Sequence, residues 1–452
     1  MLHALLAVTL LLQQPPVAPP APSTPPKSPP SFAEVAAEHF ASWDRNTDGK
    51  LDADEIDVLC VDPKVTGEQA AAAAAIKRIV RSGKYAVPEL TREYLTTPPK
   101  PVSKPASKLP VPPHVEPATA TQPPAQPPAK ASTTDPLEQA AGSPDAQDHR
   151  DAPEQPATLK RPNFQAGYAS SLRKIRATRP DLFRDDTPDL DHCHQGPLGD
   201  CYFVAAVGAF VHRDSAAVKQ MIKERDGGGY DVHFGDGRSI ELPPLTDAEL
   251  ALSGTTGDEG LWLPVLEKAL GALRHQADPK RYAMETSTDA IARGGSTATI
   301  IRMLTGHQTT RIVLKKRPRG TVPGPDGKPV PKPPVPAADP DELAARLRTE
   351  VGSALREKRL VACGAGTEPH PPGINGKHAY AVLAFDAEND LLTLWNPHGN
   401  TFRPKGEAGL EHGYATRAGV FRIPVRDFVQ VFGGLALETD RALPAATQGP
   451  GK

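Results

Sequence analysis

The sequence contains little of what marks several large protein classes. Four cysteines in 452 residues are too few for a disulfide framework. A formal net charge of −2 gives no overall attraction to nucleic acid or to an anionic membrane. Apart from a run near the amino terminus, no stretch is apolar for long enough to suggest a membrane span. We therefore expect no nucleic-acid partner and no membrane span in the mature chain, and the oligomeric state is left open.

The amino terminus carries one apolar run, from Ala4 to Leu12, which only Thr9 interrupts. Its length suits the core of a signal peptide and is too short for a transmembrane helix. Basic residues are missing ahead of it, where only the amino group and His3 stand. We expect residues 1–22 to be a signal peptide, and the protein to be secreted or held in the periplasm or cell envelope. A cytoplasmic protein is the alternative.

The 52 prolines divide the rest of the chain. They crowd into residues 15–30, 98–156 and 317–340, where a packed core is not expected. The predicted units after the signal peptide are a Pro-rich segment (23–30), a small helical domain (31–96), a disordered Pro/Ala-rich linker (97–164), a larger domain (165–440, with an insertion at 317–340) and a tail (441–452). The length of the linker predicts loose mechanical coupling between the two folded units.

Residues 44–55, DRNTDGKLDADE, have the spacing of a twelve-residue calcium loop. Gly49 stands at the sharp turn and Leu51 at the apolar position. The predicted ligands are Asp44, Asn46, Asp48, the carbonyl of Lys50, Asp52 and the bidentate Glu55. A solvated acidic turn would explain the charges, but not the glycine, the leucine and the glutamate together. The loop resembles an EF-hand, with Ca²⁺ as its cofactor.

EF-hands usually pair, and a second, degenerate loop is predicted nearby. Gly83 and Glu89 keep the spacing from the sixth to the twelfth position, and Tyr85 would stand opposite Leu51. The first, third and fifth positions would be residues 78, 80 and 82, which provide no carboxylate. We expect one calcium ion per pair and favour an anchoring or targeting role for this domain.

Cys201 follows Gly199 and Asp200 and opens the run YFVAAVGAFVH, which has helical spacing. The unpaired N–H groups and the dipole at a helix start stabilise a thiolate, so we expect a lowered pKa at Cys201. Cys363, within LVACGAG, is better explained as a buried core residue. Cys201 is therefore the candidate nucleophile.

The segment 376–399, GKHAYAVLAFDAENDLLTLWNPHG, reads as two strands joined by a turn. A hairpin centred near 387–388 places His378 across from residues 396–398, beside Asn396. His378 is thus the candidate base, and Asn396 the group that orients it. The amide of Gln195, with the Cys201 backbone N–H, would stabilise an oxyanion.

These segments resemble calpains, the papain-like, calcium-dependent cysteine proteases. QGPLGDCYF is similar to their nucleophile motif, GKHAY to their histidine segment and LWNPHG to their asparagine segment, and further likenesses extend the resemblance over 165–438. It implies an α+β fold with a two-lobed protease core, a Cys201–His378–Asn396 triad with Gln195 as oxyanion donor, and protein or peptide substrates. It also implies calcium in the core, for which we name no ligands.

Two substitutions depart from the family pattern at the site. Tyr202 and His398 each replace a tryptophan. In such enzymes, the tryptophan that His398 replaces shields the His–Asn pair from water. A catalytically inactive calcium-binding scaffold and a thiol acyl-transferase of transglutaminase type are therefore the competing functions. A metal site built from His192, Cys193, His194 and Cys201 is a weaker alternative, because the spacings fit no common zinc pattern.

Overall fold

The computed structural model describes residues 29–82, 85, 87–97, 162–184, 188–257, 259–282, 286–315, 321–323, 329–331, 339–367 and 369–443. The predicted signal peptide (1–22) lies outside the described residues. Most residues of each of four other predicted segments also lie outside the described residues: the segment 23–30, the linker 97–164, the insertion 317–340 and the tail 441–452. The predictions for these segments stay predictions.

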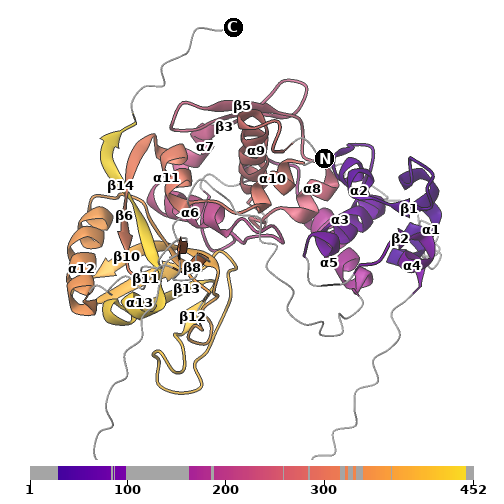
Figure 1. Ribbon diagram of the computed structural model, residues 1–452. Coiled ribbons are helices and arrows are strands. Elements are labelled where there is room, and N and C mark those ends of the chain that lie inside the picture. The colour runs from indigo at the N-terminus through magenta and orange to yellow at the C-terminus, as the bar shows by residue number, and fades with distance from the viewer. Residues whose placement is uncertain are drawn as a thin grey trace, which may run out of the picture.

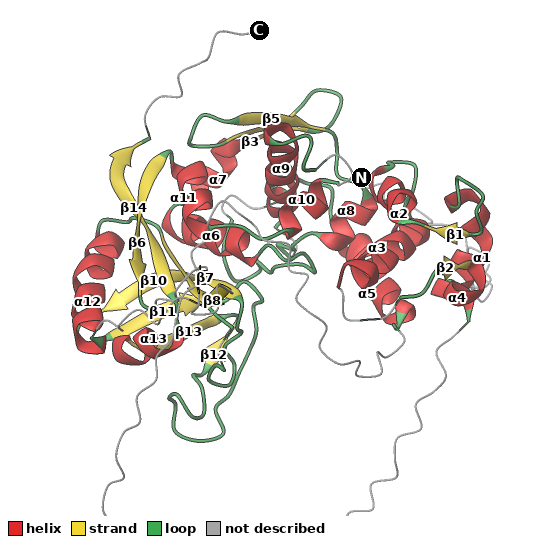
Figure 2. Cartoon of the chain, viewed as in Figure 1, coloured by secondary structure: helices red, strands yellow, loops and turns green. Residues whose placement is uncertain are grey.

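Helices and strands both contribute to the described chain, so the predicted mixed α+β class is confirmed (Figure 1, Figure 2). The helices are α1 (Phe32–Trp43), α2 (Ala53–Val61), α3 (Gly67–Ser82), α4 (Arg92–Thr96), α5 (Phe164–Ala177), α6 (Cys201–Arg213), α7 (Ser215–Met221), α8 (Asp247–Leu252), α9 (Trp262–Ala277), α10 (Ser287–Ala292), α11 (Thr297–Thr305), α12 (Pro340–Arg356) and α13 (Val425–Val431). The strands are β1 (Lys50–Leu51), β2 (Leu90–Thr91), β3 (Ile222–Glu224), β4 (Tyr230–His233), β5 (Ser239–Leu242), β6 (His307–Val313), β7 (Thr321–Pro323), β8 (Pro329–Pro331), β9 (Val361–Ala365), β10 (His378–Asp386), β11 (Leu391–Trp395), β12 (Thr416–Arg417), β13 (Val420–Pro424) and β14 (Gly434–Ala442).

A seven-stranded antiparallel sheet, in the order β12-β13-β11-β10-β9-β14-β6, forms one half of the larger domain. Alternate residues of its central strands enter two different cores, as the period of two dictates. Ala379 and Ala381 of β10 pack with α6, whereas Tyr380 and Val382 pack with α12 and α13. The sheet therefore lies between α6 on one face and α12 with α13 on the other.

The predicted hairpin is confirmed. β10 pairs with β11 through Ala381↔Trp395 and Val382↔Leu394, and a bulge follows between Val382 and Ala384. The register lies within a residue or two of the predicted one, because the turn and the alternating apolar positions both specify it. The start of β10 thus lies beside the chain that leaves β11.

The amino-terminal module, residues 29–97, consists of α1 to α4 and the short ladder between β1 and β2. Leu51 pairs with Leu90, so the prediction that Tyr85 stands opposite Leu51 was wrong. The reason is that α3 continues to Ser82, and the predicted second loop would have begun inside this helix. Glu89 instead forms an ion pair with Lys50, with Nζ and Oε1 2.8 Å apart.

The module packs tightly against the larger domain, so the expectation of loose coupling was also wrong (Figure 1). Residues 70–76 of α3, six alanines and one isoleucine, are completely buried, because small side chains let α5 and α8 approach closely. The backbone N–H of Gly67 donates to Asp247 at 2.7 Å, and that of Phe32 donates to Gln165 at 2.7 Å. One hydrophobic core runs through both units.

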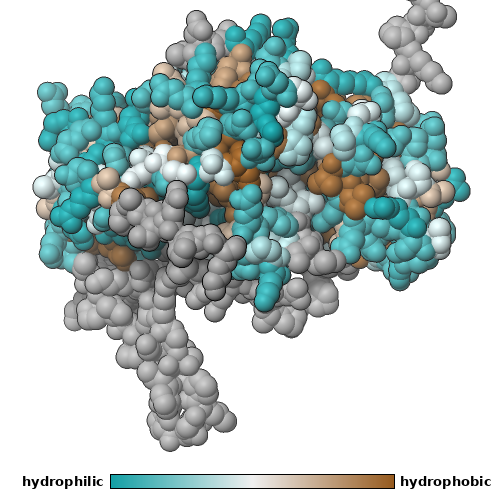
Figure 3. Space-filling view, turned by 90° about the horizontal axis from the view of Figure 1, so that it is seen from above, coloured by the Kyte–Doolittle hydropathy of each residue, from teal (hydrophilic) through white to brown (hydrophobic). Residues whose placement is uncertain are grey.

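The surface is polar over most of the face seen in Figure 3, where hydrophobic residues form separate brown areas among hydrophilic ones. The large hydrophobic side chains exposed among the described residues are Val61, Val80 and Leu410. None of the helices in the described ranges is both long and apolar enough to cross a bilayer.

Candidate active site

Cys201 is the first residue of α6, as the sequence predicted. The next ten residues of this helix are buried, and the helix packs against β10. Gly208 permits this approach, because a Cβ atom there would lie 2.4 Å from the ring of Trp395 on β11. The helix start is thereby held against the strand that begins with His378.

The loop before Cys201 is fixed from two sides. His194 forms a backbone bridge with Thr255, and the Gln195 N–H donates to the carbonyl of Pro397 at 2.7 Å. Gly196 leaves no room for a side chain, since a Cβ atom would lie 2.0 Å from the carbonyl oxygen of Ser253. The Gln195 loop is therefore locked to the segment that carries Asn396.

His378 and Asn396 are in direct contact. The Nε2 atom of His378 lies 2.8 Å from Oδ1 of Asn396, and the backbone N–H of His398 donates to the same atom at 3.0 Å. A backbone N–H can only donate, so the shared atom is the amide oxygen. Nε2 of His378 must then carry the proton, which leaves Nδ1 as the basic nitrogen.

Two further asparagines hold Asn396, and sequence reasoning did not find them. The Nδ2 atom of Asn396 donates to Oδ1 of Asn375 at 3.0 Å and to Oδ1 of Asn400 at 2.9 Å. Asn396 is 1% exposed. The signal was present, because Asn375 lies three residues before His378 and Asn400 four residues after Asn396.

His398 lies where the family pattern has tryptophan, and its ring stacks on that of His378. The ring centroids are 4.2 Å apart, with 27° between the planes. Burial and, to a smaller extent, the nearby His398 lower the pKa of His378 to about 3, against the opposing effect of the bond to Asn396. The imidazole of His378 is therefore neutral at neutral pH.

The expected lowering of the Cys201 pKa was wrong for this structure. Burial raises the pKa of the Cys201 thiol to about 11 and outweighs the backbone N–H groups of Ala379 and Tyr202, which lower it. Among the described residues no hydrogen bond joins the Cys201 sulfur to His378; the sulfur meets β10 at the Ala379 N–H. The resting pair is a neutral thiol beside a neutral imidazole.

The side-chain amide of Gln195 donates within its own loop in this structure. Its Nε2 donates to the carbonyl of Leu198 at 2.6 Å, and its Oε1 is buried with no partner in the described part of the chain. The second N–H of the amide group is not used in that bond.

A buried acid pair lies behind the nucleophile, and sequence reasoning missed its role. Asp200 and Glu267 of α9 are 0% and 2% exposed, and burial raises the pKa of each carboxyl group. Glu267 accepts the Gly254 N–H at 2.8 Å, and Lys174 donates to the Gly254 carbonyl at 2.9 Å. Burial lowers the pKa of Lys174 to about 8. Because burial raises both pKa values, negative charge on the two acids is disfavoured beside Cys201.

The predicted metal set of His192, Cys193, His194 and Cys201 does not converge. Within the described ranges, the group of side chains whose ligand atoms come together is Asp189, His192 and Glu259, with all three atoms within 4.8 Å of one another. Cys193 is completely buried with a raised pKa. The weaker zinc alternative is therefore wrong.

The six predicted calcium ligands lie on the loop that joins α1 to α2. Gly49 has a φ of 84°, as the predicted turn requires. Asp44 and Glu55, the first and last acids, are 8% and 5% exposed. Glu55 Oε1 accepts the backbone N–H of Arg45 at 2.7 Å and that of Asn46 at 3.1 Å, so its carboxylate reaches back to the loop start. Asp52 caps α2, its Oδ1 accepting from the Glu55 N–H at 2.8 Å.

Comparison with known proteins identifies the larger domain. The family model described as calpain family cysteine protease matches residues 168–407, just over half of the chain. No curated protein matches the sequence. The match includes the start of α6, the hairpin of β10 and β11, and both acids of the buried pair, Asp200 and Glu267. The chain therefore belongs to the calpain family of cysteine proteases and is a cysteine peptidase.

Proposed function

We propose that the protein is an endopeptidase whose nucleophile is Cys201, with His378 as general base and acid, Asn396 as the orienting group and Gln195 as oxyanion donor. The observation that carries this proposal is the oxygen of Asn396, which accepts from both His378 Nε2 and the His398 N–H. It leaves Nδ1 of His378 as the one nitrogen able to take a proton, at the strand end that α6 packs against.

The proposed mechanism starts from a neutral Cys201 thiol and a neutral His378 imidazole. The Cys201 sulfur attacks the scissile carbonyl carbon while its proton moves to His378 Nδ1. When the C–N bond breaks, Nδ1 returns this proton to the leaving amine, and a thioester remains. Water then attacks the thioester, giving a proton to Nδ1; the C–S bond breaks and the thiol regains its proton. A substrate that displaces water favours this coupled transfer, since no separated ion pair has to persist at the buried site.

The experiment is cleavage of casein and of a fluorogenic peptide by the full chain. Cys201→Ala should abolish cleavage, whereas Cys363→Ala, which removes a buried thiol elsewhere, should retain it when the protein is folded. Amine incorporation into casein without cleavage would indicate the acyl-transferase instead. Equal cleavage by wild type and Cys201→Ala would refute the proposed nucleophile.

A non-catalytic scaffold is the second candidate. It is favoured by the raised pKa of Cys201 and by the missing hydrogen bond between Cys201 and His378 in the described chain. Active-site titration distinguishes the two functions. A folded protein that neither cleaves peptides nor reacts with a peptidyl electrophile at Cys201 would be a scaffold.

We propose further that residues 44–55 bind one Ca²⁺ ion in an EF-hand, through Asp44, Asn46, Asp48, the Lys50 carbonyl, Asp52 and Glu55. Two nearly buried acids at opposite ends of the loop, and the left-handed turn at Gly49, support this. Isothermal titration should give one site in the wild type and none in Glu55→Gln. If Glu55→Gln still needs calcium for cleavage, the requirement belongs to the protease domain and not to this loop.

Export remains a proposal that rests on the apolar run of residues 4–12. Expression of the full-length gene in a host with a secretory pathway tests it. We expect the secreted or periplasmic product to begin near residue 23, as read by mass spectrometry of its amino terminus. An unprocessed amino terminus in the cytosolic fraction would exclude export.

A further inference from the structure

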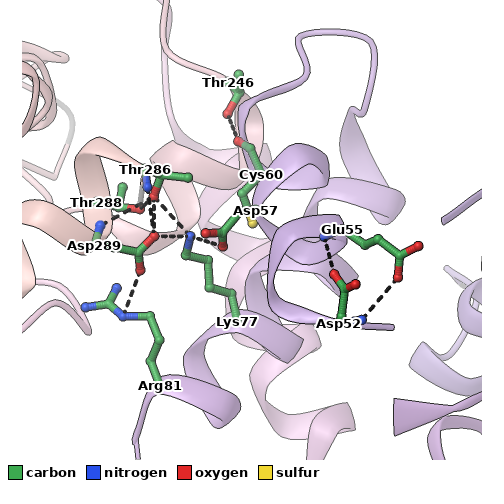
Figure 4. Close-up of polar contacts among 10 residues, drawn as sticks. All are labelled: Asp52, Glu55, Asp57, Cys60, Lys77, Arg81, Thr246, Thr286, Thr288 and Asp289. Atoms are coloured by element: carbon green, nitrogen blue, oxygen red, sulfur yellow. Dashed lines mark hydrogen bonds and ion pairs between the residues drawn. The ribbon is translucent and has the colours of Figure 1, made fainter. Parts of the chain in front are cut away.

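Lys77 of α3 is a buried cation at the boundary between the module and the protease domain. It is 2% exposed, and its Nζ lies 2.6 Å from Asp57 of α2 and 2.6 Å from Asp289 of α10 (Figure 4). It also donates to the hydroxyl of Thr286 at 3.0 Å. A buried lysine is costly to leave without carboxylate partners, and here one partner comes from each side of the boundary.

The amino-terminal end of α10 is held by these contacts. Thr286 caps the helix, and its hydroxyl and backbone N–H both contact the Asp289 carboxylate, at 2.5 and 3.2 Å. Arg81, also on α3, lies 3.1 Å from the other oxygen of Asp289 (Figure 4). Both cations come from the module, so the module holds this end of α10.

The carboxyl-terminal end of α10 contacts Tyr202, the residue that follows the nucleophile Cys201. The Tyr202 hydroxyl donates to the carbonyl of Ile291 at 2.9 Å. Arg274 donates to the carbonyls of Ala290 at 2.8 Å and Gly294 at 2.9 Å, with its guanidinium 5.1 Å from the centre of the Tyr202 ring. Tyr202 is fixed by α10 and is bonded to Cys201 through the chain.

The two sets of contacts are separated by one short helix. Six residues of α10 span about 9 Å at about 1.5 Å per residue. We propose that α10 is a strut between the module and the nucleophile, and that Lys77 is a positioning residue that sets Tyr202 and Cys201 through it. The inference rests on the proposed role of Cys201 and names no step that Lys77 performs itself.

Loss of the Lys77 amine has a defined consequence. Asp57 and Asp289 are left close together without their shared cation, and repulsion moves α10 away from α2. The Tyr202 contact then loosens, and Cys201, which is already partly exposed, becomes more accessible to water. Thiolate is the reactive form, so relief from burial raises the alkylation rate of Cys201, while the lost alignment lowers peptide cleavage. Partial unfolding would raise alkylation at the buried thiols Cys60, Cys193 and Cys363 as well, so a rise confined to Cys201 distinguishes positioning from partial unfolding.

The test uses the full chain and the rate of Cys201 alkylation by iodoacetamide, with the label located by mass spectrometry. Variants are Lys77→Met, Tyr202→Phe and their combination, measured well below each unfolding midpoint. Lys268→Met is the matched control, because Lys268 is also a nearly buried lysine. Its Nζ lies 2.7 Å from Glu249 of α8, so its ion pair does not involve α10. Asp289→Asn serves if Lys77→Met does not fold, since it removes the ion pairs that join Lys77 and Arg81 to α10.

We expect Lys77→Met, or Asp289→Asn in its place, to raise the alkylation rate about tenfold and lower kcat/KM about tenfold. Lys268→Met should change each less than about twofold, and the double variant should change no more than Lys77→Met alone. Unchanged alkylation in a folded variant, or additive effects of Lys77→Met and Tyr202→Phe, would overturn the strut. The alkylation result stands even if the wild type cleaves no peptide, so failure of the proposed function is recognised separately.

Discussion

His378 makes the stability of the protein depend on pH in a way that one substitution can isolate. The side chain is 7% exposed, and burial, followed by the charge of His398, lowers its pKa from 6.5 to about 3. In the unfolded chain the imidazole returns to its ordinary pKa. Between these two values the unfolded state binds more protons than the folded state. Stability contributed by the neutral imidazole is therefore complete above the unfolded pKa and decreases as the pH falls toward 3.

The size of the effect follows from the shift. Each pH unit within the window costs about 1.4 kcal/mol, so acidification from about pH 7.5 to about pH 4.5 removes about 3 kcal/mol of unfolding free energy. Other groups titrate over the same range. A comparison with His378→Gln removes their contribution, because glutamine does not titrate and can still donate to Asn396.

Urea denaturation of wild type and His378→Gln at the two pH values is the assay. The difference in unfolding free energy between the two proteins should change by about 3 kcal/mol, in the direction that favours the variant at low pH. His398→Gln, measured in parallel, should show a smaller change, since His398 is more exposed and its pKa is lowered by burial to a lesser degree. Parallel curves for wild type and His378→Gln would show that His378 is not held neutral by the fold.

Three shorter predictions concern the site, the core and the loop. Asn396→Ala should lower kcat at least about tenfold with little change in KM, because His378 loses the acceptor that sets its tautomer; equal kcat in steady-state assays would contradict this. Gly208→Ala should destabilise the fold by about 1–3 kcal/mol in urea, because the new methyl group collides with the buried ring of Trp395; an unchanged midpoint would mean that α6 can shift. Calcium at about a hundredfold excess over Kd should stabilise the wild type by about 2.7 kcal/mol and Glu55→Gln by much less, as followed by differential scanning calorimetry; an equal gain in both would remove Glu55 from the ligand set.

The features that could be predicted from the sequence are those set by local pattern. Cys201 begins a helix because an apolar run with helical spacing follows Asp200 directly. The meeting of His378 with Asn396 followed from the turn between two alternating strands, whose register depends on neighbouring residues alone. Strict spacing likewise identified the turn at Gly49.

The features that could not be predicted depend on distant parts of the chain. The pKa of Cys201 is decided by burial against β10, which no local pattern reports. Lys77 lies 212 residues from its partner Asp289, and a lysine in an alanine-rich helix gives no sign of burial. The wrong pairing of Tyr85 with Leu51 has another cause. The ladder between β1 and β2 has two residues per strand, and so short a stretch has no alternation of apolar residues from which its register could be predicted.

The close packing of the module has a consequence for limited proteolysis. All the contacts described between the module and the protease domain are made by residues outside 98–161, the segment that joins them. A cut anywhere in that segment would leave two fragments that still carry all of these contacts. The module would then change from a tethered part, present at a high local concentration, into a separate subunit lost on dilution. A single cleavage, by this peptidase or by another, would thus convert a fixed component into an exchangeable one.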